Sequence, residues 1–148
     1  MSGSALAIVM AIVAGLAGSV QVAVMSALGD RIGVTGALAF ATTFTAVLAI
    51  AIVLVGQHSL RAFPRAFDQP WWMLLGGVMG LFIILTITFA GPRIGITAVV
   101  AILIAGQLVA GAAIDRFGWF GVDRIALSWP RALGIVLLGI GAALSPKR

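Results

Sequence analysis

Three residues in one apolar stretch are spaced so that their side chains fall on a single face of a helix. Gln107, Gly111 and Asp115 follow one another at intervals of four residues. Residues four apart lie one above the other on a helix, so the three form a strip from the middle of the stretch to its end. A glutamine amide offers two donors and an acceptor and exchanges no proton. The strip is therefore a candidate site for a polar ligand.

The remaining residue types give little support to catalysis or metal binding. The chain has no cysteine and one histidine, His58, which has no second ligand type beside it, so no metal site is predicted. No nucleophile–base pair occurs in the apolar stretches. All four carboxylates lie in predicted turns or near helix ends: Asp30, Asp68, Asp115 and Asp123. We expect no catalytic residue, no enzyme activity, no metal and no cofactor.

The composition places the chain in a membrane. Of the 148 residues, 62% are hydrophobic and 9% are charged, whereas soluble domains have roughly 45–50% and 25%. Lipid must therefore contact much of the surface. The net charge of +5 comes from basic residues scattered at the ends of apolar runs, as in membrane proteins, so no nucleic-acid partner is expected.

Five apolar segments are long enough, or nearly so, to cross a membrane as helices. We predict one transmembrane domain over residues 1–148. Its helices are predicted at about 4–28, 35–55, 71–90, 97–114 and 130–144. The first segment is too long for a signal peptide and has no charged segment before it, so it is predicted to be retained. Polar turns are predicted at 29–33 and 91–95, and the longer connections, rich in Arg and aromatic residues, at the membrane surface.

The basic residues give no clear orientation. With the N-terminus on one side, that side carries five basic residues and the other side carries four, which is almost no bias. The five are Arg61, Arg65, Arg116, Arg124 and Arg131; the four are Arg31, Arg93, Lys147 and Arg148. Two explanations stay open: another feature sets the orientation, or the chain inserts both ways up.

The intramembrane polar residues have two interpretations. Gln21 and Gln107 either bond to other helices and only hold them together, or line a substrate cavity, and a polar face beside small residues serves both roles equally. Threonines on the second and third helices are expected to donate to carbonyls four residues earlier. Small residues that permit close helix packing are Gly76, Gly80, Ala101, Ala105, Gly134, Gly139 and Gly141.

Several of these segments together resemble the YdcZ family within the drug/metabolite transporter superfamily. The matching segments are PWWMLLGGVMG (70–80), GPRIG (91–95), AGQLVAG (105–111), DRFGWFG (115–121) and RALGIVLLGIGAAL (131–144), in the family's order and spacing. The resemblance covers nearly the whole chain and is strongest after Pro70. It implies an all-α, multi-pass protein of the bacterial inner membrane, with five transmembrane helices, that transports a small molecule.

The resemblance also implies an assembly. Larger superfamily members have ten helices in two inverted halves, so a five-helix chain would complete that architecture by dimerising within the lipid. The near-equal charge count suits an antiparallel, dual-topology pair. A homodimer is expected, and a heterodimer with a related chain is the alternative.

The site that the resemblance implies consists of neutral residues around a central cavity. The substrate-binding positions are Gln21, Gln107, Thr43, Phe44 and Gly111. Relatives tend to have an asparagine where Met25 stands, Ser-Phe in place of Thr43-Phe44, and a small polar residue at Gly111, so this cavity is more apolar than theirs. The competing hypothesis is a non-transporting membrane assembly subunit, in which the glutamines only join helices.

Overall fold

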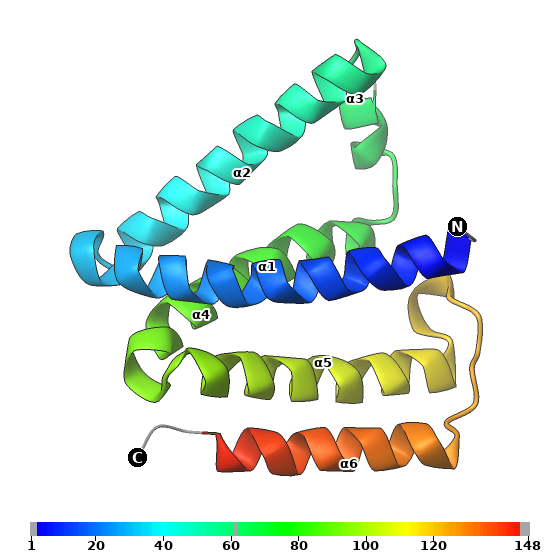
Figure 1. Cartoon of the computed structure of the whole chain (residues 1–148). Coiled ribbons are helices and arrows are strands. Elements are labelled where there is room, and N and C mark those ends of the chain that lie inside the picture. Colours follow the sequence, from blue (N-terminus) through cyan, green and yellow to red (C-terminus); the bar gives the residue numbers. More distant parts are fainter. Residues whose placement is uncertain (1–2, 61, 146–148) are drawn as a thin grey trace. The chain divides into compact units, whose positions relative to one another are not determined.

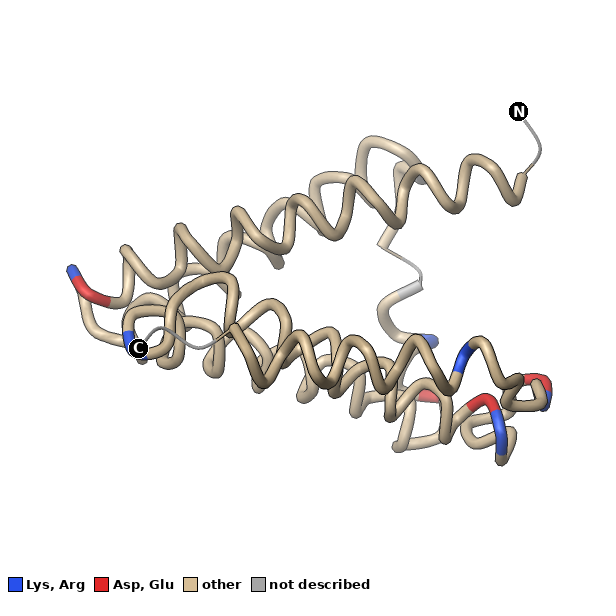
Figure 2. The backbone as a smooth tube through the Cα atoms, turned by 60° about the horizontal axis from the view of Figure 1, so that its bottom comes forward, with Lys and Arg blue, Asp and Glu red and all other residues tan. Residues whose placement is uncertain are grey.

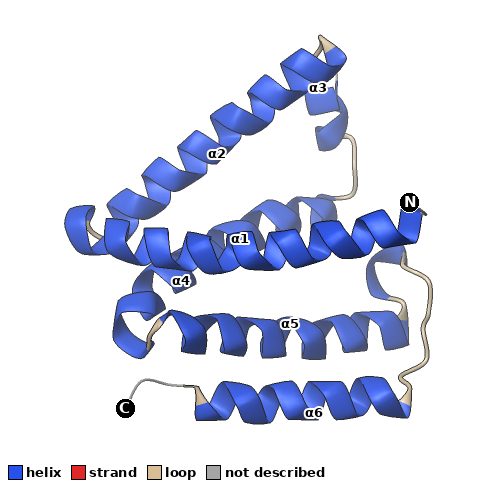
Figure 3. Cartoon of the chain, in the orientation of Figure 1, coloured by secondary structure: helices blue, strands red, loops and turns tan. Residues whose placement is uncertain are grey.

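The computed structural model describes residues 3–60 and 62–145, and within these ranges the chain forms helices and connections without a strand (Figures 1 and 3). The elements are α1 (Gly3–Ile32), α2 (Val34–Gln57), α3 (Ala62–Phe67), η1 (Trp71–Leu74), α4 (Leu75–Ile94), α5 (Ile96–Phe117), η2 (Trp119–Gly121) and α6 (Trp129–Leu144). The prediction of an all-α membrane protein is confirmed. Dimerisation stays a prediction.

Four helical segments are long and apolar enough to cross a membrane: α1, α2, η1 with α4, and α5. The fifth, α6, has 16 residues and is therefore about 24 Å long. Figure 2 shows the charged residues of the described chain at helix ends and in connections, and none in the middle of a long helix. Arg61, Lys147 and Arg148 lie outside the described residues, so the structure does not test the count of basic residues on each side.

The turns at 29–33 and 91–95 are shorter than the sequence predicts. Helix α1 continues through Arg31 to Ile32, and α4 continues through Pro92 and Arg93 to Ile94. Only Gly33 (φ 81°) and Gly95 (φ 88°) leave the helical conformation, since a glycine alone accepts these angles without strain. An arginine in the last helical turn interacts favourably with the negative end of the helix dipole, which helps the helix to persist through the polar segment.

The described chain divides into two compact units, which we describe separately: Met1–Ala23 with Ala90–Arg148, and Val24–Phe89. In the second unit α1 and α4 meet at Gly29 and Thr88. A Cβ placed on Gly29 would lie 2.6 Å from Cγ2 of Thr88, whose residue is 1% exposed. Gly29 was predicted only as part of a turn, so this contact between α1 and α4 was missed.

In the first unit α5 and α6 pack along each other (Figure 1). The pair is antiparallel, because Asp115 near the end of α5 bonds Arg131 near the start of α6. Ser128 is the N-cap residue of α6, with Pro130 in the first turn as predicted, although the Ser128 hydroxyl makes no capping bond. The connection between the two helices exposes aromatic rings, including those of Trp119 and Phe120.

Candidate functional site

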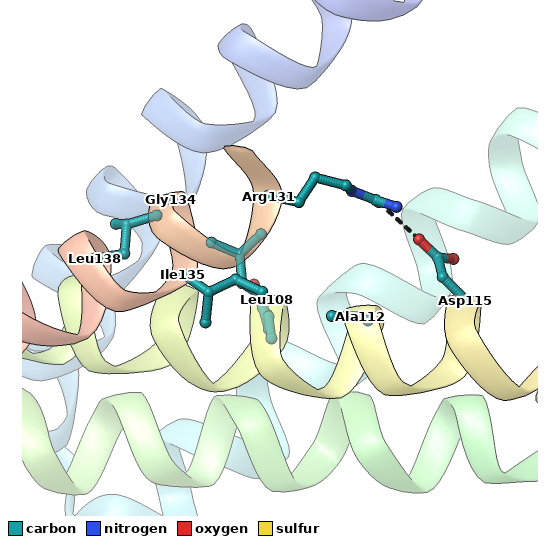
Figure 4. Close-up of a pocket in the computed structure, with 9 residues that line it drawn as sticks. Leu108, Ala112, Asp115, Arg131, Gly134, Ile135 and Leu138 are labelled. Atoms are coloured by element: carbon teal, nitrogen blue, oxygen red, sulfur yellow. Dashed lines mark hydrogen bonds and ion pairs between the residues drawn. The ribbon is translucent and has the colours of Figure 1, made fainter. Parts of the chain in front are cut away.

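A groove between α5 and α6 contains most of the polar strip that the sequence predicts. Figure 4 shows residues that line this groove, and its volume is about 300 Å³. We call it the glutamine groove. It is lined by Gln107, Leu108, Gly111, Ala112, Asp115, Arg131, Gly134, Ile135 and Leu138. The helical spacing correctly places Gln107, Gly111 and Asp115 on one face of α5, and this face is the one turned to the groove.

Gln107 is the neutral polar group of this groove. Its side chain is exposed, and the structure gives its amide no hydrogen bond to any other described residue. Moving an amide from water into lipid without a hydrogen-bond partner costs about 2–7 kcal/mol of free energy, depending on the reference state. The amide therefore needs water, a ligand or another protein chain as its partner.

An ion pair closes the other polar end of the glutamine groove. Nη2 of Arg131 donates to Oδ2 of Asp115 at 2.7 Å, and Figure 4 shows the two side chains reaching toward each other from α6 and α5. The carboxylate is more enclosed than the guanidinium, with side-chain exposures of 27% and 46%. Asp115 is eight residues from Gln107, so the pair lies about 12 Å along the helix axis from it.

The chain after α5 holds this end of the groove in place. The N–H of Gly118 donates to the carbonyl of Ile114 at 2.8 Å and ends the helix, and the N–H of Ile125 donates to the carbonyl of Asp115 at 2.8 Å. The connection therefore folds back onto the last turn of α5 before α6 begins. This return brings Arg131 level with Asp115.

A second groove runs along a different face of the same helix pair and has no polar side chain. We call it the alanine groove; its volume is about 580 Å³. It is lined by Ile102, Ala105, Gly106, Val109, Ala110, Ile135, Gly139, Ala142 and Ala143. Ala110 and Gly111 are neighbours in sequence but belong to different grooves, which makes them a matched pair for experiments.

A third groove lies in the other unit, between α2 and α4. We call it the threonine groove; its volume is about 470 Å³, and it is lined by Thr42, Thr45, Ala46, Ala49, Gly77, Val78, Gly80, Leu81 and Ile84. The Thr42 hydroxyl donates to the carbonyl of Leu38 at 2.8 Å. Thr86 and Thr88 likewise donate to carbonyls four residues earlier, at 2.8 and 2.7 Å, as the sequence predicts. The expected bond is not made by the hydroxyls of Thr35, Thr43 and Thr45 among the described residues.

The structure brings together only some of the residues that the resemblance implies for the site. Gln107 and Gly111 share the glutamine groove. Gln21 is exposed on α1 and is not among the residues of that groove. Thr43 and Phe44 are exposed on α2 beside the threonine groove without lining it, and the Phe44 ring stacks on Phe40 with 6.2 Å between ring centroids. A role for these residues in binding stays a prediction.

The small residues predicted to pack closely have open space around them within the chain. A Cβ added to any of five glycines would meet no atom within 4 Å: Gly76, Gly80, Gly134, Gly139 and Gly141. Ala101 and Ala105 are half-buried on α5. Close packing at these positions stays a prediction that concerns a partner chain.

Arg131 is a residue of the site that its sequence position did not reveal. It was predicted only as one of five basic residues on one side of the membrane, and its pairing with Asp115 depends on how the α5–α6 connection returns. One signal was present in the sequence: Asp115 ends one apolar segment and Arg131 begins the next, so both belong to the same face of the membrane.

Comparisons with known proteins agree with the observed fold. The family model described as "Putative inner membrane exporter, YdcZ" matches residues 6–144. "Inner membrane protein YdcZ" of Escherichia coli (strain K12) is 35% identical over 78 residues, which are 53% of this chain and 52% of that protein. The match thus spans about half the length of that relative. No solved structure matches the chain.

Proposed function

We propose that the chain is a small-molecule transporter, because it belongs to the YdcZ family of inner-membrane proteins, which is described as an exporter family. The observation that carries the proposal is the glutamine groove. It joins an unbonded amide on an apolar helix to an ion pair at the helix end. A transporter needs such a polar path from the membrane surface toward the midplane.

The proposed transporter is a dimer of two chains in opposite orientations around a central cavity. The near-equal charge count supports dual insertion, and the open space beside Gly139 supports close approach of a second chain. A reporter fused after Arg148 should then report both sides of the membrane. A C-terminus on one side only would contradict a single-chain dual-topology protein.

The dimer contact is tested at α6. Gly139→Leu should separate the protomers or abolish folding, because its side chain would fill the space that a neighbouring helix needs. Cross-linking in native membranes measures the outcome. An unaltered dimer in both detergent and lipid would show that this face of α6 does not form the contact.

The rival function is a non-transporting assembly subunit, in which Gln107 bonds a partner helix. Either function supplies a hydrogen-bond partner for the Gln107 amide, but only a transporter keeps water beside it. The two are separated by asking whether water reaches the glutamine groove.

The natural absence of cysteine makes this experiment direct. A thiol reacts as the thiolate, which forms in water and not in lipid. Gly111→Cys places a single thiol in the glutamine groove, where a Cβ meets no atom within 4 Å. Ala110→Cys is the matched control in the alanine groove. Each variant is treated with a charged, membrane-impermeant thiol reagent, in spheroplasts and in inverted vesicles.

A transporter predicts fast labelling of Gly111→Cys and slow labelling of Ala110→Cys. A site that alternates between the two sides is labelled completely from either side alone, whereas a site open to one side is labelled only in the copies that face the reagent. Equal, slow labelling of both thiols would favour the assembly subunit.

A further inference from the structure

The ion pair at the end of the glutamine groove has unused bonding capacity on both partners. A guanidinium has five N–H donors and a carboxylate has two acceptor oxygens. In the structure they share one contact, from Nη2 of Arg131 to Oδ2 of Asp115, and make no other side-chain bond among the described residues. The pair can therefore bind a ligand while each charge stays compensated.

Helix stability does not explain why these charges stand where they do. Asp115 lies in the last turns of α5, near the negative end of that helix dipole, and Arg131 lies in the first turn of α6, near the positive end. Each helix end favours the opposite charge. The reversed arrangement, with Arg on α5 and Asp on α6, would keep the pair and suit both dipoles.

Charge balance limits which ligands this end of the groove accepts. A monovalent cation that binds Asp115 leaves the charge of Arg131 without a partner. A monovalent anion that binds Arg131 leaves the charge of Asp115 without a partner. Either ligand leaves one charge without a partner in a partly exposed site, which is less favourable than pairing both charges. A zwitterion replaces one ion pair by two, because its cationic group takes the carboxylate and its anionic group takes the guanidinium, and the site stays neutral.

The rest of the groove limits the size and the body of the ligand. Its volume of about 300 Å³ is at the lower limit of ordinary ligand pockets. Next to the ion pair its walls are apolar or small, with Leu108, Ala112 and Ile135 among them. A small molecule with a zwitterionic head and a short aliphatic body fits the ion pair and the apolar walls beside it.

We infer that Asp115 and Arg131 form the head-group subsite of the transporter, and that this subsite selects small zwitterions with an apolar body. The inference rests on the proposed transport function, and it adds the substrate class. It treats the ion pair as a binding element that exchanges its internal bond for bonds to the ligand.

Three probes with the same aliphatic body test the inference. Leucine carries both charges, isoamylamine is leucine without the carboxylate, and isocaproate is leucine without the ammonium group. Binding is measured by saturation-transfer NMR on the purified full chain in lipid nanodiscs, with empty nanodiscs to subtract partitioning into lipid. Leucine should bind up to about fivefold more tightly than either monovalent probe, since each of these leaves one charge of a partly exposed pair without a partner.

Single variants should change the preferred probe, which a purely structural ion pair would not do. Arg131→Gln leaves the carboxylate alone, so isoamylamine should overtake leucine. Asp115→Asn leaves the guanidinium alone, so isocaproate should overtake leucine. The double variant Asp115→Arg/Arg131→Asp keeps a neutral pair, so it should restore the preference for leucine and show that the single variants failed through charge.

Three outcomes would overturn the inference: a monovalent probe that binds the native chain best, an order of probes that no variant changes, or saturable binding of none of the three. The thiol-labelling experiment keeps this failure apart from failure of the transport proposal. If Gly111→Cys is labelled from both sides while leucine does not bind, the transport proposal stands and the substrate class is wrong. If Gly111→Cys is also unreactive, both are wrong.

Discussion

Thr42 in the threonine groove and Gln107 in the glutamine groove are both polar side chains on apolar helices, but their hydrogen bonding differs. In the threonine groove the Thr42 hydroxyl donates to the carbonyl of Leu38 on its own helix. In the glutamine groove the amide of Gln107 has no partner among the described residues. The Thr42 hydroxyl is hydrogen-bonded within its own helix, whereas the Gln107 amide needs a hydrogen-bond partner that enters the groove.

This difference gives a rule for interpreting polar residues in membrane helices. A threonine hydroxyl is short enough to reach the carbonyl one turn back, so its presence in lipid needs no further explanation. A glutamine amide has more donors and acceptors than its own helix can satisfy. We therefore expect substitutions in the threonine-rich unit to change stability, and substitutions in the glutamine groove to change access and binding.

The largest effect is expected where a threonine packs against another helix. Gly29→Ala would place a methyl group 2.6 Å from Cγ2 of Thr88, and overpacking of this kind costs about 1–3 kcal/mol of unfolding free energy. Unfolding by a denaturing detergent in mixed micelles, followed through the fluorescence of the four tryptophans, measures the loss.

Two further variants show whether the contact itself is responsible. Thr88→Ser removes Cγ2, so the double variant Gly29→Ala/Thr88→Ser should recover most of the lost stability. Gly77→Ala, where a Cβ meets nothing within 4 Å, should instead stabilise the helix by up to about 1 kcal/mol. Equal stability of Gly29→Ala and Gly77→Ala would show that α1 and α4 do not meet at Gly29.

A smaller effect, on access rather than folding, is expected at Gln107. In the Gly111→Cys background, Gln107→Leu should slow thiol labelling at least about tenfold, which corresponds to about 1.4 kcal/mol, because the amide no longer holds water in the groove. The dimer should stay intact. If the glutamine only joins helices, the same change should lower stability by about 0.6 kcal/mol and leave the labelling rate unchanged.

The smallest effect is expected at Thr42, whose hydroxyl bonds its own helix. Thr42→Val keeps the shape of the side chain, so unfolding free energy should change by no more than about 0.5 kcal/mol. Labelling of Gly111→Cys should be unaffected. A slower rate, as with Gln107→Leu, would mean that the threonine groove belongs to the substrate path, which would remove the contrast between the two grooves.

Local sequence patterns predict much of this fold, because lipid imposes simple constraints on a chain. Apolar runs of about 20 residues must be helical to satisfy their backbone groups, and the long helices lie where such runs occur. The same regularity placed Gln107, Gly111 and Asp115 on one face. The ends of the helices were less predictable, since polar residues such as Asp30 and Arg31 remain helical at the edge of an apolar run.

Contacts between helices could not be predicted from the same patterns. The Asp115–Arg131 pair requires the register of α5 against α6, and the Gly29–Thr88 contact requires the crossing point of α1 and α4. Neither register is encoded in the periodicity of a single helix. For the same reason, the roles of Gln21, Thr43 and Phe44 stay predictions from the family resemblance.

The shortness of α6 has a consequence for the surrounding bilayer. At about 24 Å, α6 is shorter than a hydrocarbon core of about 30 Å, and a short helix is accommodated when the membrane thins beside it. Since α6 forms one wall of the glutamine groove, the thinning would occur next to the polar path. Lipid acyl-chain length would then regulate the protein: short chains match α6, and long chains impose a mismatch energy that grows with each added ångström.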